Sequence, residues 1–259
     1  MLYNNQKMSE YYKMTGQKWE SVISGDITEL KSPDGLEVRI LNAENVRNAL
    51  LPENSEKPLV IFISGTSESG KSTFGKLAVK TGIAHRLKIY KTLAETAGEE
   101  DLPDMEDNPF NYATSLESNP RLIEKAGQRI ISKYVNLMLE TDVPAAIVET
   151  IKHKWMVGCF RSNPNIRFLS IVIDADLEKR IRREATKTGR PIEEVRADVL
   201  KKDEWKQELG SKDVESTADV YILNNGDYNT YEKMVISFLR AWQKKTRSYS
   251  GKAHDYSLD

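Results

Sequence analysis

Residues 65–73 read Gly-Thr-Ser-Glu-Ser-Gly-Lys-Ser-Thr and combine the residue types and spacing that bind phosphate. Two glycines separated by four residues and followed by Lys-Ser let the backbone turn tightly, so that successive amides point at phosphate oxygens. A helix beginning here adds the partial positive charge of its N-terminus. In such a loop the lysine bridges the terminal phosphates and the serine offers its hydroxyl to Mg²⁺. We therefore predict that ATP and Mg²⁺ bind here, and a plain glycine-rich turn is the alternative. The predicted nucleotide-binding residues are Gly65, Ser67, Ser69, Gly70, Lys71, Ser72 and Thr73.

A carboxylate follows another apolar run of the chain. Glu149 comes directly after residues 145–148, Ala-Ala-Ile-Val, so it would emerge at the carboxyl end of a strand, where ligands of open α/β folds collect. It is a candidate for a water-mediated Mg²⁺ contact or for the base that receives the acceptor's proton, unless it is only a solvated strand end. Lys152, His153 and Lys154 come next and could hold an anionic acceptor or form a solvated cationic turn.

Basic residues gather in residues 176–190, which contain six bases and three acids. Arginines on a helix and the turn after it can close over a transferring phosphoryl group and stabilise its charge. Arg183 is the first choice for this role because it lies about one helical turn after Arg180. The alternative is a solvated helix with internal ion pairs, such as Glu178 with Arg182.

Apolar runs and helical periodicity indicate the elements that position these residues. Strands that are apolar on both faces alternate with helices, which predicts a parallel sheet covered on both sides. The predicted strands are residues 59–63, 145–148, 168–173 and 220–223, with a weaker edge strand at 86–90, and an amphipathic helix covers 120–140.

The two ends of the chain differ from this pattern. Upstream of a boundary near residue 57 we expect a turn at 33–35, a strand at 36–41 and a helix capped by Asn42. Residues 244–259 show no apolar periodicity, so we expect a flexible tail. The predicted organisation is an N-terminal extension at 1–57, a catalytic domain at 58–243 and the tail at 244–259.

Composition excludes several classes of function. Among 259 residues, 38 Lys and Arg face 39 Asp and Glu, and the net charge of -1 gives no overall attraction to nucleic acid or to an anionic membrane. No apolar run of membrane-spanning length and no signal peptide is evident, so we expect a cytoplasmic protein. The single Cys159 and three scattered histidines do not have the spacing of a metal site.

The chain resembles the dephospho-CoA kinase and nucleoside monophosphate kinase group over residues 58–243. The resemblance rests on the first strand with its phosphate loop, the arginine-rich segment, and residues 218–227, Ala-Asp-Val-Tyr-Ile-Leu-Asn-Asn-Gly-Asp. It implies a three-layer P-loop NTPase fold with a mostly parallel sheet and an arginine-rich lid. It further implies that the lid contacts the ATP phosphates and that the loop after the last strand holds adenine. The residues so assigned are Arg180, Arg183 and Arg190 in the lid, and Asn225 and Gly226 in the loop.

Two stretches bear on the acceptor. Dephospho-CoA kinases carry an acidic residue just after their second strand, whereas residues 86–91 here carry bases, which argues against dephospho-CoA. Residues 99–107 contain six acids and no base, as a solvated loop does. If this run borders the acceptor, it would repel a phosphorylated one unless Arg121 and Arg129 offset it, or it would select a polar or cationic acceptor.

The expected function is ATP- and Mg²⁺-dependent phosphoryl transfer to a small acceptor such as a nucleotide, a nucleoside or a CoA-precursor-like compound. One alternative is a nucleotide-switched regulatory NTPase, although the Asn-Lys-x-Asp signature of GTPases is absent from the sequence. Another is a 5′-end nucleic-acid kinase, although the aromatic residues do not cluster with bases as a nucleic-acid groove requires.

Overall fold

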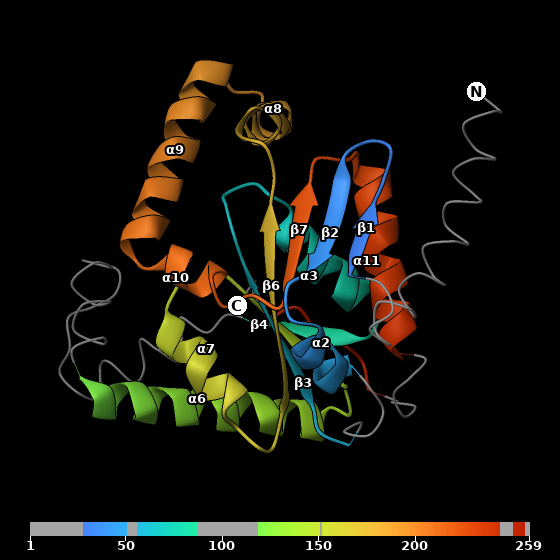
Figure 1. Cartoon of the computed structure of the whole chain (residues 1–259), viewed down its shortest axis with the longest axis vertical. Coiled ribbons are helices and arrows are strands. Elements are labelled where there is room, and N and C mark those ends of the chain that lie inside the picture. Colours follow the sequence, from blue (N-terminus) through green and yellow to red (C-terminus); the bar gives the residue numbers. More distant parts are fainter. Residues whose placement is uncertain (1–27, 51–55, 88–118, 151, 244–250, 257–259) are drawn as a thin grey trace.

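The computed structural model describes residues 28–50, 56–87, 119–150, 152–243 and 251–256, which form a seven-stranded sheet flanked by helices (Figure 1). The strand order is β1-β2-β7-β6-β3-β5-β4. The strands are β1 (Glu29–Lys31), β2 (Leu36–Ile40), β3 (Leu59–Ser64), β4 (Ala84–Leu87), β5 (Ala145–Glu149), β6 (Arg167–Asp174) and β7 (Val220–Asn224). The run from β4 to β7 is parallel, and β2 pairs antiparallel with β7. The predicted α/β class with a mostly parallel sheet is confirmed, and β4 is an edge of the parallel part, although it begins two residues before the predicted strand.

Helices cover both faces of the sheet. They are α2 (Ala43–Leu50), α3 (Lys71–Lys80), α6 (Pro120–Glu140), α7 (Lys154–Arg161), α8 (Leu177–Thr188), α9 (Ile192–Glu208), α10 (Ser211–Glu215) and α11 (Tyr228–Gln243). The long helix predicted at 120–140 is confirmed as α6. In the described part of the chain, no helix combines the length and the apolar character that crossing a membrane requires.

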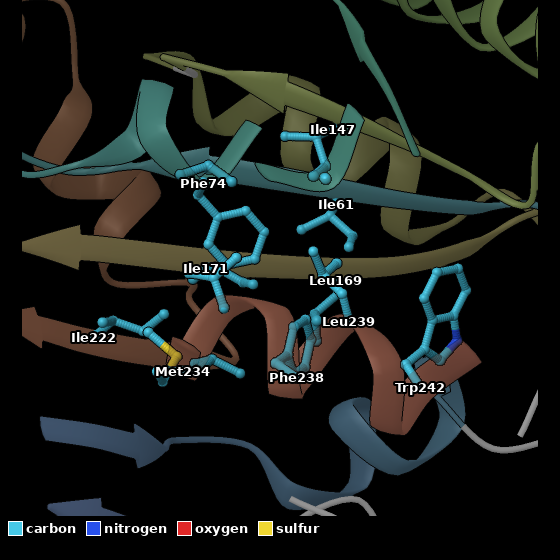
Figure 2. Packing of buried hydrophobic residues seen from close by; sticks show 14 of the residues in the cluster. Ile61, Phe74, Ile147, Leu169, Ile171, Ile222, Met234, Phe238, Leu239 and Trp242 are labelled. Carbon is cyan, nitrogen blue, oxygen red and sulfur yellow. The ribbon is translucent and has the colours of Figure 1, made fainter. Parts of the chain in front are cut away.

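Alternation along β3 divides the core into two layers. Leu59, Ile61 and Ile63 face the cluster that includes α3 and α11, and Val60 and Phe62 face the cluster that includes α6 and α7. Figure 2 shows the first cluster, in which strand residues pack against side chains of α3 and α11. Burial on both faces explains why the central strands have no polar alternation.

Helices α8 and α9 extend beyond the carboxyl end of β6 (Figure 1). They pack on each other through a small cluster of their own, built from Ile181, Val195 and Val199. The lid predicted from the arginine-rich segment is therefore a helix pair at the carboxyl ends of the central strands, where the phosphate loop also lies.

The described part of the predicted N-terminal extension joins the sheet through β2. The backbone amide of Asn45 donates to Oδ1 of Asn42 at 3.0 Å, which confirms the predicted cap of α2. The domain boundary near residue 57 remains a prediction.

Part of the predicted flexible tail lies against the sheet. The amide of Arg86 in β4 donates to the carbonyl of His254 at 3.0 Å, and the amide of Tyr256 donates to the carbonyl of Arg86 at 2.8 Å. Residues 251–256 thus lie beside β4, where the open backbone groups of an edge strand accept a further segment, and the flexibility of the tail stays a prediction. The acidic run at 99–107 lies outside the described residues.

Candidate nucleotide and phosphoryl-transfer site

The phosphate loop connects β3 to α3, and two of its positions require glycine. Gly65 has φ +115°, and a Cβ atom there would lie 2.0 Å from the carbonyl oxygen of Ile173 in β6. Gly70 has φ +111°, and its Cβ would lie 2.6 Å from Nδ2 of Asn224 in β7. Both glycines have a left-handed backbone conformation, and both lie so close to a neighbouring strand that a side chain would clash with it.

Side chains from β7 and α11 hold the second half of this loop. Asn224 donates from Nδ2 to the carbonyl of Ser69 at 2.8 Å. The hydroxyl of Tyr231 donates to the carbonyl of Gly70 at 3.1 Å. These two loop carbonyls are therefore turned into the protein. Of the loop amides, that of Ser67 donates to Oδ1 of Asp203 at 2.8 Å.

Lys71 is the first residue of α3 and is buried. Its ammonium group donates to the carbonyl of Thr66 and contacts Oγ of Ser69 at 3.4 Å. Burial, and then the positive charge of Lys206, lower the pKa of Lys71 to about 7. A phosphate ligand would favour the charged form of Lys71, because an adjacent opposite charge raises the pKa of an amine.

The structure brings Ser72 and Glu149 together. The Ser72 hydroxyl donates to Oε2 of Glu149 at 3.1 Å across a sequence separation of 77 residues. Hydroxyl and carboxylate oxygens suit Mg²⁺, which also keeps water and phosphate ligands. Among the described residues no group of three or more His, Cys, Asp and Glu could hold a metal ion. Ser72 and Glu149 would hold Mg²⁺ together with water and phosphate oxygens.

Arg86 fixes the orientation of Glu149. Its Nε lies 2.5 Å from Oε1 and its Nη2 lies 2.9 Å from Oε2, so the pair is bidentate. Its remaining Nη1 donates to Oδ2 of Asp255 at 3.0 Å. In the sequence, Arg86 departs from the acidic pattern of dephospho-CoA kinases. No feature of the sequence indicates that it pairs with Glu149.

A cavity of about 820 Å³ lies between the loop, β7, α8 and α9. Its charged lining is mostly cationic, with Lys71, Lys76, Arg183, Lys187, Lys202 and Lys206 against Glu68 and Asp227. A cavity with this excess of positive charge is suited to a polyphosphate.

Of the residues predicted for the lid and the adenine loop, Arg183 and Gly226 line the cavity. Arg183 donates from Nη2 to the carbonyl of Gly226 at 2.7 Å, which joins α8 to the loop after β7. Asn225 does not line the cavity, and its Oδ1 accepts from the amide of Asp176 at 2.9 Å.

The two other predicted arginines lie outside the cavity. Arg180 is buried, forms an ion pair of 2.5 Å with Asp203 of α9, and donates to the carbonyl of Ser67 at 3.0 Å. Arg190 is exposed and pairs with Asp198 at 2.7 Å. Arg180 therefore anchors the helix pair to the phosphate loop, and Arg190 is an ion-pair partner within the helix pair.

Sequence reasoning missed the wall that α9 contributes. Lys202, Trp205 and Lys206 line the cavity, and the Lys206 ammonium donates to Oγ of Ser67 at 2.7 Å. Spacing of three and four residues places these side chains on one helix face, which is the signal that could have identified them. Lys152 lies beside this wall, with its ammonium 3.5 Å from the centre of the Trp205 ring.

The other two residues of the predicted cationic turn have different surroundings. His153 is buried, and burial followed by the charge of Lys152 lowers its pKa to about 4. Lys154 begins α7 and is exposed. The structure thus brings only Lys152 close to the cavity wall.

No protein-family model and no curated protein matches the chain. Among solved structures, the chain is similar to TT1252 from Thermus thermophilus, with 17% identity, 74% of this chain and 100% of the other covered, and a TM-score of 0.43. It is similar to a dephospho-CoA kinase from Campylobacter jejuni, with 14% identity, coverage of 71% and 97%, and a TM-score of 0.39. A gluconokinase from Sinorhizobium meliloti 1021 matches with 15% identity, coverage of 72% and 93%, and a TM-score of 0.38. Similarity this distant concerns the arrangement of strands and helices and carries no argument about the substrate.

Proposed function

We propose that this chain transfers the γ-phosphoryl group of ATP to a hydroxyl group of a small acceptor in a Mg²⁺-dependent reaction. The observation that carries the proposal is the meeting of Ser72 and Glu149 at 3.1 Å beside the phosphate loop. A glycine-rich turn that binds no ligand would not require a carboxylate from a neighbouring strand next to its serine.

Each residue of the site would have a defined role. The loop amides and Lys71 hold the phosphates, and Ser72 and Glu149 hold Mg²⁺, which neutralises phosphate charge when it is bound. Both oxygens of Glu149 already accept hydrogen bonds, which favours its role as a metal contact over that of a base. Arg183, whose Nη2 donates to the carbonyl of Gly226, would turn toward the terminal phosphate to stabilise the charge of the group being transferred.

The reaction balances without a further reactant. The acceptor oxygen forms a bond to the γ-phosphorus as the bond from that phosphorus to the β–γ bridging oxygen breaks. ADP leaves with the electron pair of the broken bond, and the hydroxyl proton passes to water.

The loop after β7, at Gly226, would lie beside adenine, and we expect ATP to bind more tightly than GTP in a competition assay.

The test measures ATP consumption by the full chain against nucleosides, nucleotides, CoA precursors and sugars. Replacing Lys71 by Met should weaken ATP binding and lower turnover by at least about 10²-fold, because the phosphates lose their buried cation. Replacing Lys80 by Met is the matched control, since Lys80 lies on the same helix with its side chain 72% exposed. Unchanged turnover in the Lys71 variant would refute the assignment of the site.

A further inference from the structure

The cavity has two walls that contact different halves of the phosphate loop. Asn224 and Tyr231 bond to the loop at Ser69 and Gly70, on the β7 side. On the α9 side, Lys206 bonds to Ser67. If adenine lies beside the loop after β7, the triphosphate runs along the loop and its terminal phosphate points toward the α9 wall.

The α9 wall consists of Lys202, Trp205 and Lys206, and Thr150 lies in the same cavity. Thr150 directly follows Glu149, the proposed metal contact, so this part of the cavity is where an acceptor hydroxyl can approach the terminal phosphate. Trp205 gives the wall a flat apolar surface. Lys152 does not line the cavity, and its ammonium group lies 3.5 Å from the centre of the Trp205 ring, where it helps to hold the ring in place.

Positive charge in the cavity as a whole exceeds what the nucleotide needs. Six cations and two acids line the whole cavity. That excess is larger than the roughly two negative charges that ATP keeps when Mg²⁺ is bound. Burial lowers the pKa of Lys206 from its usual value, and burial followed by the charge of Lys206 lowers that of Lys152 to about 7. Asp203 and Glu68 offset part of this positive charge, and a further negatively charged group would favour the protonated form of both lysines.

We propose that the α9 wall binds the phosphoryl acceptor and that this acceptor carries a phosphate or carboxylate group held by Lys206. This inference rests on the proposed function, because it uses the direction of the bound nucleotide. Lys206 is then a specificity-determining residue, and Lys152 is a positioning residue that acts through Trp205.

The first experiment compares acceptors in matched pairs: nucleosides with their 5′-monophosphates, and neutral sugars with their phosphates and with the corresponding sugar acids. We expect kcat/KM at least about tenfold higher for the anionic member, and the two kinds of anionic member distinguish phosphate from carboxylate recognition. Equal use of a neutral member would overturn the inference and leave the proposed kinase function intact.

The second experiment needs no turnover. The full chain is saturated with Mg²⁺ and a non-hydrolysable ATP analogue and titrated with inorganic phosphate or acetate while tryptophan fluorescence is recorded. We expect a saturable change that is lost in W205F and weakened at least about tenfold in K206M. The control K201M, an exposed lysine on the same helix, should match the unchanged protein.

Three outcomes separate the inference from the function. Failure of the ATP analogue to bind would count against both. Binding of the analogue without saturable anion binding, or with equal anion binding in K206M, would overturn the inference alone. A rise in the KM for the acceptor in K206M, with the KM for ATP changed less than about threefold, supports both.

Discussion

Lys71 and Arg86 are two buried cations of the site that are held in different ways. Arg86 lies between Glu149 and Asp255, and the hydrogen bonds to Glu149 raise its pKa further above its usual value. Lys71 has the oxygen atoms of its own loop as hydrogen-bond partners, and burial lowers its pKa to about 7. Arg86 is thus permanently charged, whereas Lys71 can gain a proton when an anion arrives.

This difference predicts that nucleotide binding takes up protons. At pH 8 a lysine with a pKa of about 7 is mostly neutral, and contact with phosphate restores its ordinary, higher pKa, so about one proton should bind with each nucleotide. The uptake should fall as the pH decreases below 7, where the free lysine is already charged. Calorimetry of the Mg²⁺ complex of an ATP analogue, in buffers of different ionisation enthalpy, measures the uptake. An enthalpy at pH 8 that does not depend on the buffer contradicts the prediction.

Arg183 and Arg190 should differ in their effect on kcat. R183M removes a guanidinium that lines the cavity, so kcat should fall by about 10²–10³-fold with a smaller change in the KM for ATP. R190M removes an exposed ion pair with Asp198 and serves as the control, with kcat within about threefold of the unchanged protein. Steady-state kinetics decide the matter, and equal kcat values for the two variants would exclude Arg183 from the reaction.

At the scale of elements, the sequence was most informative where a structure depends on neighbouring residues. Apolar runs predicted the central strands, Asn42 predicted its helix cap, and the glycine spacing predicted the loop. The pair formed by Arg86 and Glu149 was not predictable, because 63 residues separate them and only the packing of β4 beside β5 brings them together. The α9 wall was missed for the same reason, since its lysines look like an ordinary solvated helix until the helix is placed above the loop.

The close approach of α3 to Glu149 gives a test at this scale. A Cβ atom at Gly75 would lie 2.1 Å from Oε1 of Glu149, so Gly75→Ala should displace that carboxylate from Ser72. The side chain can move, so we expect a folded protein whose kcat falls at least about tenfold and whose half-maximal Mg²⁺ concentration rises.

Gly158→Ala is the matched control for this substitution. Gly158 also lies within a helix, and a Cβ atom there meets nothing within 4 Å. Alanine there should stabilise the fold by about 0.5–1 kcal/mol without changing activity. Thermal unfolding and kinetics of both variants check the pair, and full activity in Gly75→Ala would show that the contact does not matter.

At the scale of the whole molecule, segments near the two chain ends flank the parallel part of the sheet. Near the N-terminus, β2 pairs with β7, and β1 (Glu29–Lys31) pairs in turn with β2. Residues 251–256 lie beside β4 at the other side. The second of these segments also reaches the site, because Asp255 pairs with the arginine that orients Glu149.

Removing the Asp255 carboxylate should therefore weaken the metal site from a distance. In Asp255→Asn, Arg86 loses one of its two acidic partners, and we expect the half-maximal Mg²⁺ concentration to rise by about threefold to tenfold while the KM for ATP changes little. Asp213→Asn, which replaces an exposed aspartate in α10, is the control. Activity measured against Mg²⁺ concentration tests the prediction, and identical curves for the two variants contradict it.

The position of Asp255 also sets an order in time. A nascent chain emerges from the ribosome with its N-terminus first. The phosphate loop, Arg86 and Glu149 therefore emerge long before residue 255. Because Arg86 can pair with Asp255 only after residue 255 has emerged, a nascent chain that has already formed its phosphate loop still lacks the full set of contacts around Glu149. Slowing translation before residue 255 emerges would accordingly postpone the assembly of the proposed metal site while the nucleotide loop is already in place.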